Sequence, residues 1–286
     1  MKHVILIPVY NDWKSLNKLL IEIDKSLKDD SSFTTQILVI NDLSTEKCNL
    51  NIKNFSSIKK IEIINLKKNL GSQKSIAVGL NYLKKIKDNF FITVMDGDGE
   101  DNPYEIKKML NEAIKYESFV ITSNRKKRRE SMLVVLLYRI HLIISFLFAF
   151  KWISFGNFTT FNSKNLEKLL SNNSSWYAHS SSVLKNCRIK RLYAKREKRY
   201  FDKSKLNMFA LMEHSLRVNA VFLPKIFINS LIYSSIIFWA ARNFNLDYLI
   251  IFLILIFNIL LFFIRRKHYI RDLLNSDNLI DNIKLL

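Results

Sequence analysis

The sequence predicts an α/β fold with a mostly parallel sheet, followed by an interfacial helix and a C-terminal two-helix transmembrane hairpin. Three observations lead to this prediction. Strand-like and helical segments alternate through the first half of the chain, long apolar segments occupy much of the second half, and clusters of basic residues border those segments. Alternating strands and helices are typical of parallel sheets, and apolar segments of about 20 residues are long enough to cross a bilayer.

The strands of the predicted sheet are short apolar runs rich in β-branched residues, which is the composition of buried strands. Between them lie amphipathic segments with apolar residues three and four positions apart, the spacing of one helix face. We therefore expect strands at residues 3–9, 36–40, 61–65, 90–95 and 119–123, and helices at residues 13–27 and 73–86.

Two apolar segments near the C-terminus predict a transmembrane hairpin. Residues 220–241 carry the single charge of Lys225, residues 248–264 carry none, and residues 242–247 form the short loop between them. Basic residues precede the first segment and follow the second, so the positive-inside rule places both ends of the hairpin in the cytoplasm.

A third apolar segment, residues 132–150, is interrupted only by Arg139 and His141. If it crossed the bilayer, the membrane would separate the residues that follow it from the N-terminal domain. Its two polar residues also suit a helix in the interface better than one in hydrocarbon. We expect an interfacial helix, with a helix of the protein core as the alternative.

The net charge of +20, from 45 Lys and Arg against 25 Asp and Glu, indicates an anionic partner. Most of it lies in three clusters, at residues 125–130, 185–205 and 265–271, which border the apolar segments or shortly precede one. This placement favours anionic lipid headgroups or a lipid phosphate, although a single cluster is more often solvated surface charge. We expect no nucleic-acid partner, because no recognition helix, zinc finger or aromatic stacking platform is evident.

The cysteine count and the N-terminus exclude further classes. Cys48 and Cys187 lie far apart and match no ligand spacing, which argues against a disulfide framework or a zinc site. Residues 1–11 have the pattern of a strand and a turn, not of a signal peptide.

An acidic segment follows one predicted strand. Residues 92–103 read Ile-Thr-Val-Met-Asp-Gly-Asp-Gly-Glu-Asp-Asn-Pro, and an extended chain would place Asp96, Asp98 and Glu100 on one side. Carboxylates this close repel one another unless a cation binds, and oxygen ligands select Mg²⁺ or Mn²⁺. The alternative is an acidic, glycine-rich turn without a ligand.

Other predicted strands also end in polar residues. One runs into Ile-Pro-Val-Tyr-Asn-Asp at residues 7–12, another into Val-Ile-Asn-Asp-Leu-Ser-Thr-Glu at residues 39–46, and Gly71 and Gly79 lie in Asn-Leu-Gly-Ser-Gln-Lys-Ser-Ile-Ala-Val-Gly at residues 69–79. Ligands of open α/β sheets bind outside the carboxyl ends of the strands, so we expect the site there.

Taken in order, these motifs resemble the signature of family 2 glycosyltransferases, which have a GT-A, Rossmann-like fold. The second half is similar to the subgroup that makes polyprenyl-phosphate sugars, such as dolichol-phosphate mannose synthases. It shares Arg-Lys-Lys-Arg-Arg-Glu-Ser, Gly-Asn-Phe, Arg-Glu-Lys-Arg and Ser-Lys, at residues 125–131, 156–158, 196–199 and 204–205, before a membrane hairpin. The resemblance extends to about residue 264.

The resemblance implies a membrane-anchored inverting enzyme that transfers a sugar from a nucleoside-diphosphate sugar to a polyprenyl phosphate at the cytoplasmic leaflet, with Mg²⁺ or Mn²⁺ as cofactor. Its implied partners are the donor, the polyprenyl phosphate and membrane lipids, and a homo-oligomer stays open. The implied donor-side residues are Pro8, Tyr10 and Asp12, with Asp42 on the nucleoside and Asp96, Asp98 and Glu100 on the metal and diphosphate. The implied catalytic residues are Asp98, Asn157, Arg125 and Arg128, and the implied phosphate-binding residues are Arg196, Arg199 and Lys205.

Four positions depart from the family pattern. Asn41 replaces an Asp, Glu100 a Gln, Asn157 an Asp and Thr159 an Arg. An Asn cannot act as a general base, so a hydroxyl acceptor would need another proton acceptor, for which the candidates are Asp101, His179 and Glu213. A phosphate acceptor needs none, because it is largely ionised at neutral pH. Transfer to a hydroxyl of a lipid or lipid-linked glycan, or a catalytically impaired scaffold or sensor, are the alternatives.

We expect four regions along the chain. Residues 1–124 form the nucleotide-sugar-binding core, residues 125–219 the acceptor side, residues 220–264 the hairpin and residues 265–286 a cytoplasmic tail.

Overall fold

The structure is a computed structural model that describes residues 1–28, 32–51, 55–125, 132–195, 197–201, 208–240, 246–269 and 273–286. The chain divides into two compact units. We call the first the sheet unit, which comprises Met1–Arg128, Phe155–Ser204 and Ile270–Leu286, and the second the helical unit, which comprises Arg129–Ser154 and Lys205–Tyr269.

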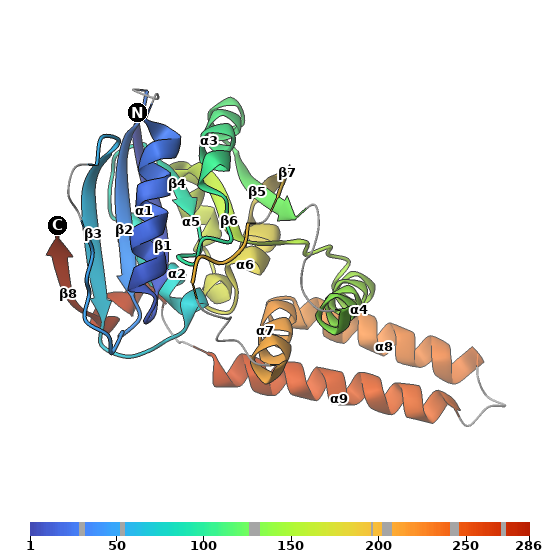
Figure 1. The fold of residues 1–286 in the computed structure, drawn as a ribbon. Helices are drawn as coiled ribbons and strands as arrows, with labels where there is room; N and C mark the ends of the chain where they lie inside the picture. The colour runs from blue at the N-terminus through green and yellow to red at the C-terminus, as the bar shows by residue number, and fades with distance from the viewer. Residues whose placement is uncertain are drawn as a thin grey trace. The chain divides into compact units, whose positions relative to one another are not determined.

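The sheet unit is built on an eight-stranded sheet with the order β7-β5-β6-β4-β1-β2-β3-β8 among the described residues. Its centre is parallel, as the alternating sequence predicts, whereas β6 and β8 run antiparallel to their neighbours. Figure 1 shows β8 at the edge of the sheet beside β3. The strands are β1 (Lys2–Val9), β2 (Thr34–Asn41), β3 (Ile58–Leu66), β4 (Phe91–Val94), β5 (Phe119–Arg125), β6 (Phe155–Asn162), β7 (Arg188–Ala194) and β8 (Ile280–Leu285).

Helices cover both faces of this sheet, because its central strands are apolar on both sides. In β1, Ile5 and Ile7 pack with α1 (Trp13–Leu27) and α3 (Ile106–Lys115). Leu6 points to the other face, where it belongs to the same buried cluster as side chains of α2 (Ser72–Leu83), α5 (Leu166–Leu169) and α6 (His179–Asn186). The result is an α/β/α arrangement with one apolar core on each side of the sheet.

The helical unit contains α4 (Met132–Ala149), α7 (Met208–Ala220), α8 (Leu223–Ala240) and α9 (Leu246–Lys267). Figure 1 shows α8 and α9 side by side. Both are long and apolar enough to cross a membrane, with mean hydropathies of 1.3 over Leu223–Ala240 and 2.7 over an 18-residue stretch of Tyr248–Lys267. A buried hydrogen bond of 2.8 Å from Asn258 Nδ2 to Ser230 Oγ joins the two helices.

The strand pairing limits how the chain can cross a membrane. The chain leaves the sheet after β5, forms α4, and returns as β6, which is hydrogen-bonded to β5. A single crossing by α4 would place these paired strands on opposite sides of a membrane, so the pairing argues against α4 as a membrane span. Likewise β7 and β8 belong to one sheet, so the segment between them can cross a membrane only an even number of times, and its described residues include two helices, α8 and α9, that are long and apolar enough to do so.

These observations confirm all five predicted strands and both predicted helices, whereas the interpretation of residues 132–150 as an interfacial helix that does not cross the membrane stays a prediction. The sequence analysis did not identify β6, β7 and β8. Each carries charged or amide side chains along its length, so none reads as an apolar strand. Strands from the regions expected as the acceptor side and the tail thus belong to the same sheet as the N-terminal strands.

Candidate active site

The polar residues that follow β1, β2 and β4 come together because these neighbouring parallel strands end at the same edge of the sheet. Pro8 is buried in β1 opposite Ile40, and Tyr10, just beyond the strand, is 42% exposed. Asp12 directly precedes α1. These three residues, which were expected on the donor side, therefore lie at the carboxyl ends of the strands, as the sequence analysis expected; their role stays a prediction.

Asp42 supports the loop that leads into α2. Its Oδ1 accepts a hydrogen bond of 2.7 Å from the backbone N–H of Leu70, and its Oδ2 accepts one of 2.8 Å from that of Gly71. Burial raises the pKa of the Asp42 carboxyl, and the two backbone N–H groups partly oppose that shift. The two segments expected to surround a nucleotide are thus connected through one side chain.

Asn11 and Asn41 hold the loop at residues 43–46, which follows Asp42. The backbone N–H of Thr45 donates to Asn11 Oδ1 over 2.8 Å, and the backbone N–H of Ser44 donates to Asn41 Oδ1 over 2.9 Å. Asn11 has a φ of 48°, a left-handed conformation that Asn adopts more readily than most residues. The sequence analysis missed Asn11; an Asn at the end of a strand beside an expected site was the available signal.

The acidic loop after β4 is folded by its own side chains. Asp98 Oδ1 accepts from the backbone N–H of Glu100 over 2.9 Å, and Asp101 Oδ2 accepts from that of Asp96 over 3.0 Å. Gly99 has a φ of 86°, and a Cβ at this position would lie 2.4 Å from the Tyr200 ring. A glycine is therefore favoured at this position for two reasons: it adopts the positive φ without strain, and it has no side chain to collide with the Tyr200 ring.

Residues 197–201 lie against this acidic loop, and Arg199 connects them to it. Arg199 Nη2 is 2.5 Å from Asp12 Oδ2, and its Nη1 is 3.2 Å from Asp98 Oδ2. The three side chains are only 20%, 13% and 15% exposed, so their charges are screened less than those of surface pairs. The backbone N–H of Tyr200 also donates to the Asp98 carbonyl over 3.0 Å.

Asn157, on β6, bridges the acidic loop and α2. Its Nδ2 donates to Asp96 Oδ1 over 2.9 Å, and its Oδ1 accepts from Gln73 Nε2 over 3.0 Å. An Asp at this position could not donate to Asp96, so the departure from the family pattern has a structural use here. Gln73, which the sequence analysis did not single out, also accepts from the backbone N–H of His179 over 2.8 Å.

His179 has the features of a structural core residue. It is fully buried, and its Nε2 shares a hydrogen bond of 2.8 Å with Thr159 Oγ1. Burial lowers the pKa of His179 to about 3, so the imidazole is neutral at physiological pH. Thr159 is itself fully buried, which leaves no room for the Arg that the family pattern has at this position.

The residues expected to bind a divalent metal supply suitable oxygen atoms without forming a complete site by themselves. Within the described part of the chain, no group of three His, Cys, Asp or Glu side chains is arranged to hold an ion. Mg²⁺ is usually bound through one or two carboxylates and completed by substrate phosphates and water, so the acidic loop fits a metal that arrives with a diphosphate.

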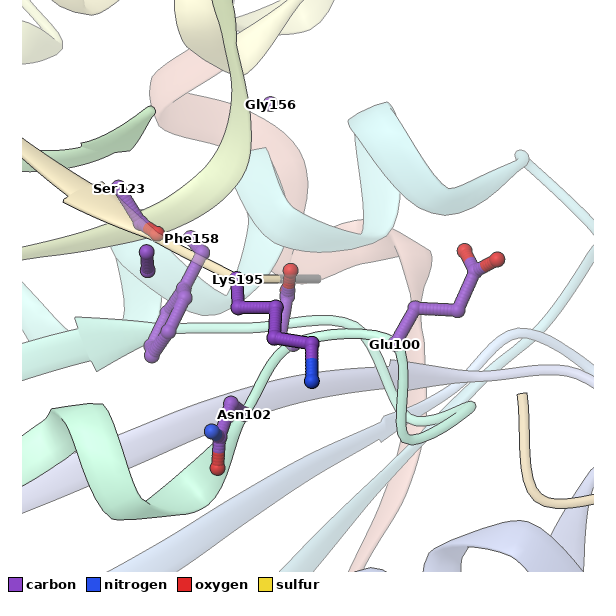
Figure 2. Close-up of a pocket in the computed structure, with 8 residues that line it drawn as sticks. Glu100, Asn102, Ser123, Gly156, Phe158 and Lys195 are labelled. Carbon is purple, nitrogen blue, oxygen red and sulfur yellow. The ribbon is translucent and has the colours of Figure 1, made fainter. Parts of the chain in front are cut away.

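A pocket opens between the acidic loop and the ends of the neighbouring strands (Figure 2). It is lined by Glu100, Asp101, Asn102, Ser123, Gly156, Phe158, Ala194 and Lys195. Figure 2 shows the Lys195 side chain extending toward the loop that carries Glu100 and Asn102. Arg125 pairs in register with Ala194, so the first basic residue of residues 125–130 lies beside the strand that leads to Lys195. Lys195 is a lining residue that sequence reasoning did not select from its cluster.

Four of the expected site residues have side chains outside the described part of the chain. Arg128, Arg196 and Lys205 lie outside the described residues, and only the backbone of Arg125 is described. Glu213 belongs to the helical unit, where it accepts from Lys267 Nζ over 3.0 Å and lies 2.7 Å from His268 Nε2.

Comparison with protein families identifies the class of protein. Residues 4–181 match the model of glycosyl transferase family 2. The match covers more than half of the chain, so the chain belongs to this family of glycosyltransferases. A search of curated proteins by sequence finds no match.

Solved structures agree with this assignment at the level of the fold. Glucosyl-3-phosphoglycerate synthase from Mycobacterium tuberculosis, in complex with Mn²⁺, uridine-diphosphate-glucose and phosphoglyceric acid, is 12% identical, with 79% of each chain covered and a TM-score of 0.55. TarS 1–349 from S. aureus, in complex with UDP-GlcNAc, is 20% identical over 85% of this chain and 74% of that chain, with a TM-score of 0.48. The first of these likenesses supports the GT-A fold predicted from the motifs.

Proposed function

We propose that this glycosyltransferase is a membrane-anchored, inverting enzyme that transfers a sugar from a nucleoside diphosphate to a polyprenyl phosphate at the cytoplasmic leaflet. The observation that carries the proposal is the mostly buried arrangement of Arg199 between Asp12 and Asp98 at the carboxyl edge of a family 2 sheet. A guanidinium beside carboxylates provides both charges that a metal-bound diphosphate requires.

The donor would lie along the strand ends. Tyr10 and Asp12 would line the nucleoside side over the buried Pro8, and Asp42 would position the loops on which the nucleoside rests. The M. tuberculosis synthase of similar fold binds Mn²⁺ and a UDP-sugar, which supports a nucleotide donor of this kind.

Asp96 and Asp98, with Glu100 beside them, would hold Mg²⁺ or Mn²⁺, which when bound neutralises charge on the departing diphosphate. Asn157 would keep Asp96 in place through its 2.9 Å hydrogen bond. Arg199 would exchange one of its carboxylate partners for a diphosphate oxygen. We assign Arg125, Arg128, Arg196 and Lys205 to the diphosphate or the acceptor phosphate on the basis of the family motifs.

In the transfer step, an oxygen of the acceptor phosphate forms a bond to the anomeric carbon while the bond from that carbon to the diphosphate breaks. The nucleoside diphosphate leaves with the bonding electron pair, and the configuration at the carbon inverts. Because a monoester phosphate has a second pKa of about 6, the acceptor is ionised at neutral pH and no side chain has to remove a proton. This matches a site with an amide at Asn157 and a buried, neutral His179.

Membrane anchoring would come from α8 and α9, whose even number of crossings keeps β7 and β8 on one side. The basic residues at the end of α9, Arg265, Arg266 and Lys267, favour the cytoplasm for that side. We also propose the four regions expected from the sequence, with β6, β7 and β8 contributing to the same sheet as residues 1–124.

One observation favours a second acceptor class. Asp101 lines the pocket beside Lys195, where a carboxylate could take a proton from a hydroxyl acceptor. Mild acid distinguishes the two products, because a glycosyl phosphate is hydrolysed readily and an ordinary glycoside is not.

The proposal is tested by incubating membranes that contain the full-length protein with labelled nucleotide sugars. The expected product is chloroform-extractable, acid-labile label that disappears in Asp98→Ala and persists in the control Asp88→Ala, which alters an exposed carboxylate outside the site. Undiminished label in Asp98→Ala would refute the assigned role of the acidic loop. Acid-stable label would refute the phosphate acceptor and support the hydroxyl alternative.

A further inference from the structure

Three asparagine side chains form a continuous row of hydrogen bonds from the C-terminal strand to the donor side of the site. Asn65 Nδ2 donates to Asn282 Oδ1 over 2.7 Å, and Asn41 Nδ2 donates to Asn65 Oδ1 over 2.7 Å. The strands place these residues directly opposite one another, with Asn41 on β2, Asn65 on β3 and Asn282 on β8. We call these three side chains the asparagine row.

The row ends on the loop that follows β2. The backbone N–H of Ser44 donates to Asn41 Oδ1 over 2.9 Å, and Ser44 Oγ accepts from the backbone N–H of Asn11 over 2.9 Å. Ser44 is therefore hydrogen-bonded to Asn11, two residues after β1, on one side and to the asparagine row on the other. Its position determines the path of the loop directly after Asp42.

The direction of every hydrogen bond in the row follows from this end. A backbone N–H can only donate, so the Asn41 oxygen must face Ser44 and the Asn41 amino group must face Asn65. The Asn65 oxygen then accepts, its amino group faces β8, and Asn282 has to present an oxygen. Each amide in the row uses both its donor and its acceptor.

The row also explains structurally why Asn41, one of the departures from the family pattern, is an amide and not a carboxylate. An Asp at this position would accept from Ser44, but its carboxylate could not donate to Asn65. Asn41 therefore accepts from Ser44 and at the same time donates to Asn65, and so connects the loop to β3 and β8. An Asp at this position would accept from Ser44 without donating to Asn65.

Strand β8, which carries the far end of the asparagine row, and the segment before it are also anchored by contacts outside the row. Asn81 on α2 donates to Ser276 Oγ over 3.0 Å in the protein interior, and Lys85 forms an ion pair with Asp277. Leu279 and Ile280 pack against the apolar core on that face of the sheet. The segment that follows the two apolar helices in the sequence is thus a fixed part of the sheet unit.

We infer that the C-terminal strand positions the donor loop through the asparagine row, with Asn282 and Asn65 acting as positioning residues for nucleotide binding. The inference rests on the proposed function for the role of residues 42–46. Neither side chain needs to touch the donor, because both act through Asn41 and Ser44.

The test measures two quantities on the purified full-length protein: the affinity for UDP, and the hydrogen exchange of backbone amides in peptides that cover residues 42–46. Asn282→Leu removes the oxygen that accepts from Asn65 at the end of the row, and because Asn282 is exposed we expect the variant to fold. It should weaken UDP binding about threefold, a loss typical of one modest hydrogen bond, and speed exchange in that loop. Asn282→Asp keeps an oxygen toward Asn65 but loses the 2.6 Å hydrogen bond that Asn282 Nδ2 donates to Asp281 Oδ2, so its loop exchange should stay closer to that of the wild type than the exchange of Asn282→Leu does.

Two further variants separate positioning from strand packing. Leu285→Ala truncates another exposed side chain of β8, outside the row, and should change neither quantity. Asn65→Leu should have a larger effect than Asn282→Leu, and the double variant should be no worse than Asn65→Leu alone, because both substitutions interrupt the same row.

Equal loop exchange in Asn282→Leu, Leu285→Ala and the wild type would overturn the inference, as would fully additive effects of the two Leu substitutions on exchange. Failure of the wild type to bind any nucleoside diphosphate would refute the proposed donor instead. In that case the exchange series still decides whether the row positions the loop.

Discussion

Replacing Arg199 by Met tests whether the acidic edge of the sheet depends on this one guanidinium. The substitution keeps an unbranched apolar chain and removes two charged contacts, of 2.5 Å to Asp12 and 3.2 Å to Asp98. Both carboxylates are largely shielded from water, so the variant leaves two poorly solvated negative charges without their shared partner. Breaking one side of a buried charge pair typically costs 3 to 5 kcal/mol, and partial exposure brings our expectation to about 2 to 3 kcal/mol.

The assay is thermal unfolding of the full-length protein in detergent, followed by a signal from the sheet unit. We expect the Arg199→Met midpoint to fall by about 4 to 12 °C, since about 1 kcal/mol shifts a domain of this size by 2 to 4 °C. Lys198→Met is the matched control, because it removes a neighbouring positive charge whose side chain is exposed. Equal midpoints for the two variants would refute the reasoning that Arg199 compensates the carboxylates.

Three other predictions concern the interior of the same unit. Burial lowers the pKa values of His3 and His179 from 6.5 to about 3, so as the pH falls the unfolded state takes up protons before the folded state does. The contribution of each histidine to the free energy of unfolding should therefore be complete above pH 6.5 and fall by about 2 kcal/mol by pH 5. A free energy of unfolding that does not change between pH 7 and pH 5, in His179→Gln and wild type alike, would contradict this. Asn157→Asp places a second carboxylate at the 2.9 Å contact with Asp96, so its unfolding midpoint should be well below that of the wild type at pH 8 and approach the wild-type midpoint at pH 5 or with Mn²⁺. The lowered midpoint of Asn157→Leu should be restored neither at pH 5 nor with Mn²⁺. Gly99→Ala adds a Cβ 2.4 Å from an aromatic ring at a φ of 86°, so transfer activity should fall at least about tenfold, and unchanged activity would show that the acidic loop adapts.

Local patterns were sufficient to predict the part of the fold that carries the proposed donor site. Strand β1 and helix α1 follow directly from an apolar run and an amphipathic period, and the acidic segment falls at the end of β4 as expected. These features depend on residues close together in the sequence. The parallel neighbours then bring their strand ends to one edge, whatever the details of the loops.

The remaining parts depend on contacts between distant residues that no local pattern encodes. Strand β8 is polar and is stabilised by its pairing with β3, more than 200 positions earlier in the chain. Gln73 gained its role only when α2 and β6 came together at Asn157. The sequence offered His179 as one candidate proton acceptor although a histidine in such a segment is more often structural, and its complete burial, which depends on the folded chain, supports the structural role.

The most direct test of the account is binding of nucleoside diphosphates to the purified full-length protein, measured as a rise in unfolding midpoint with and without Mn²⁺. A ligand that binds only the native state raises the midpoint in proportion to its affinity. We predict that at least one nucleoside diphosphate stabilises the wild type, more strongly with Mn²⁺, and that Asp98→Ala loses this response. Absence of stabilisation by every nucleoside diphosphate, or an equal response in Asp98→Ala, would contradict a donor site at the carboxyl edge of this sheet.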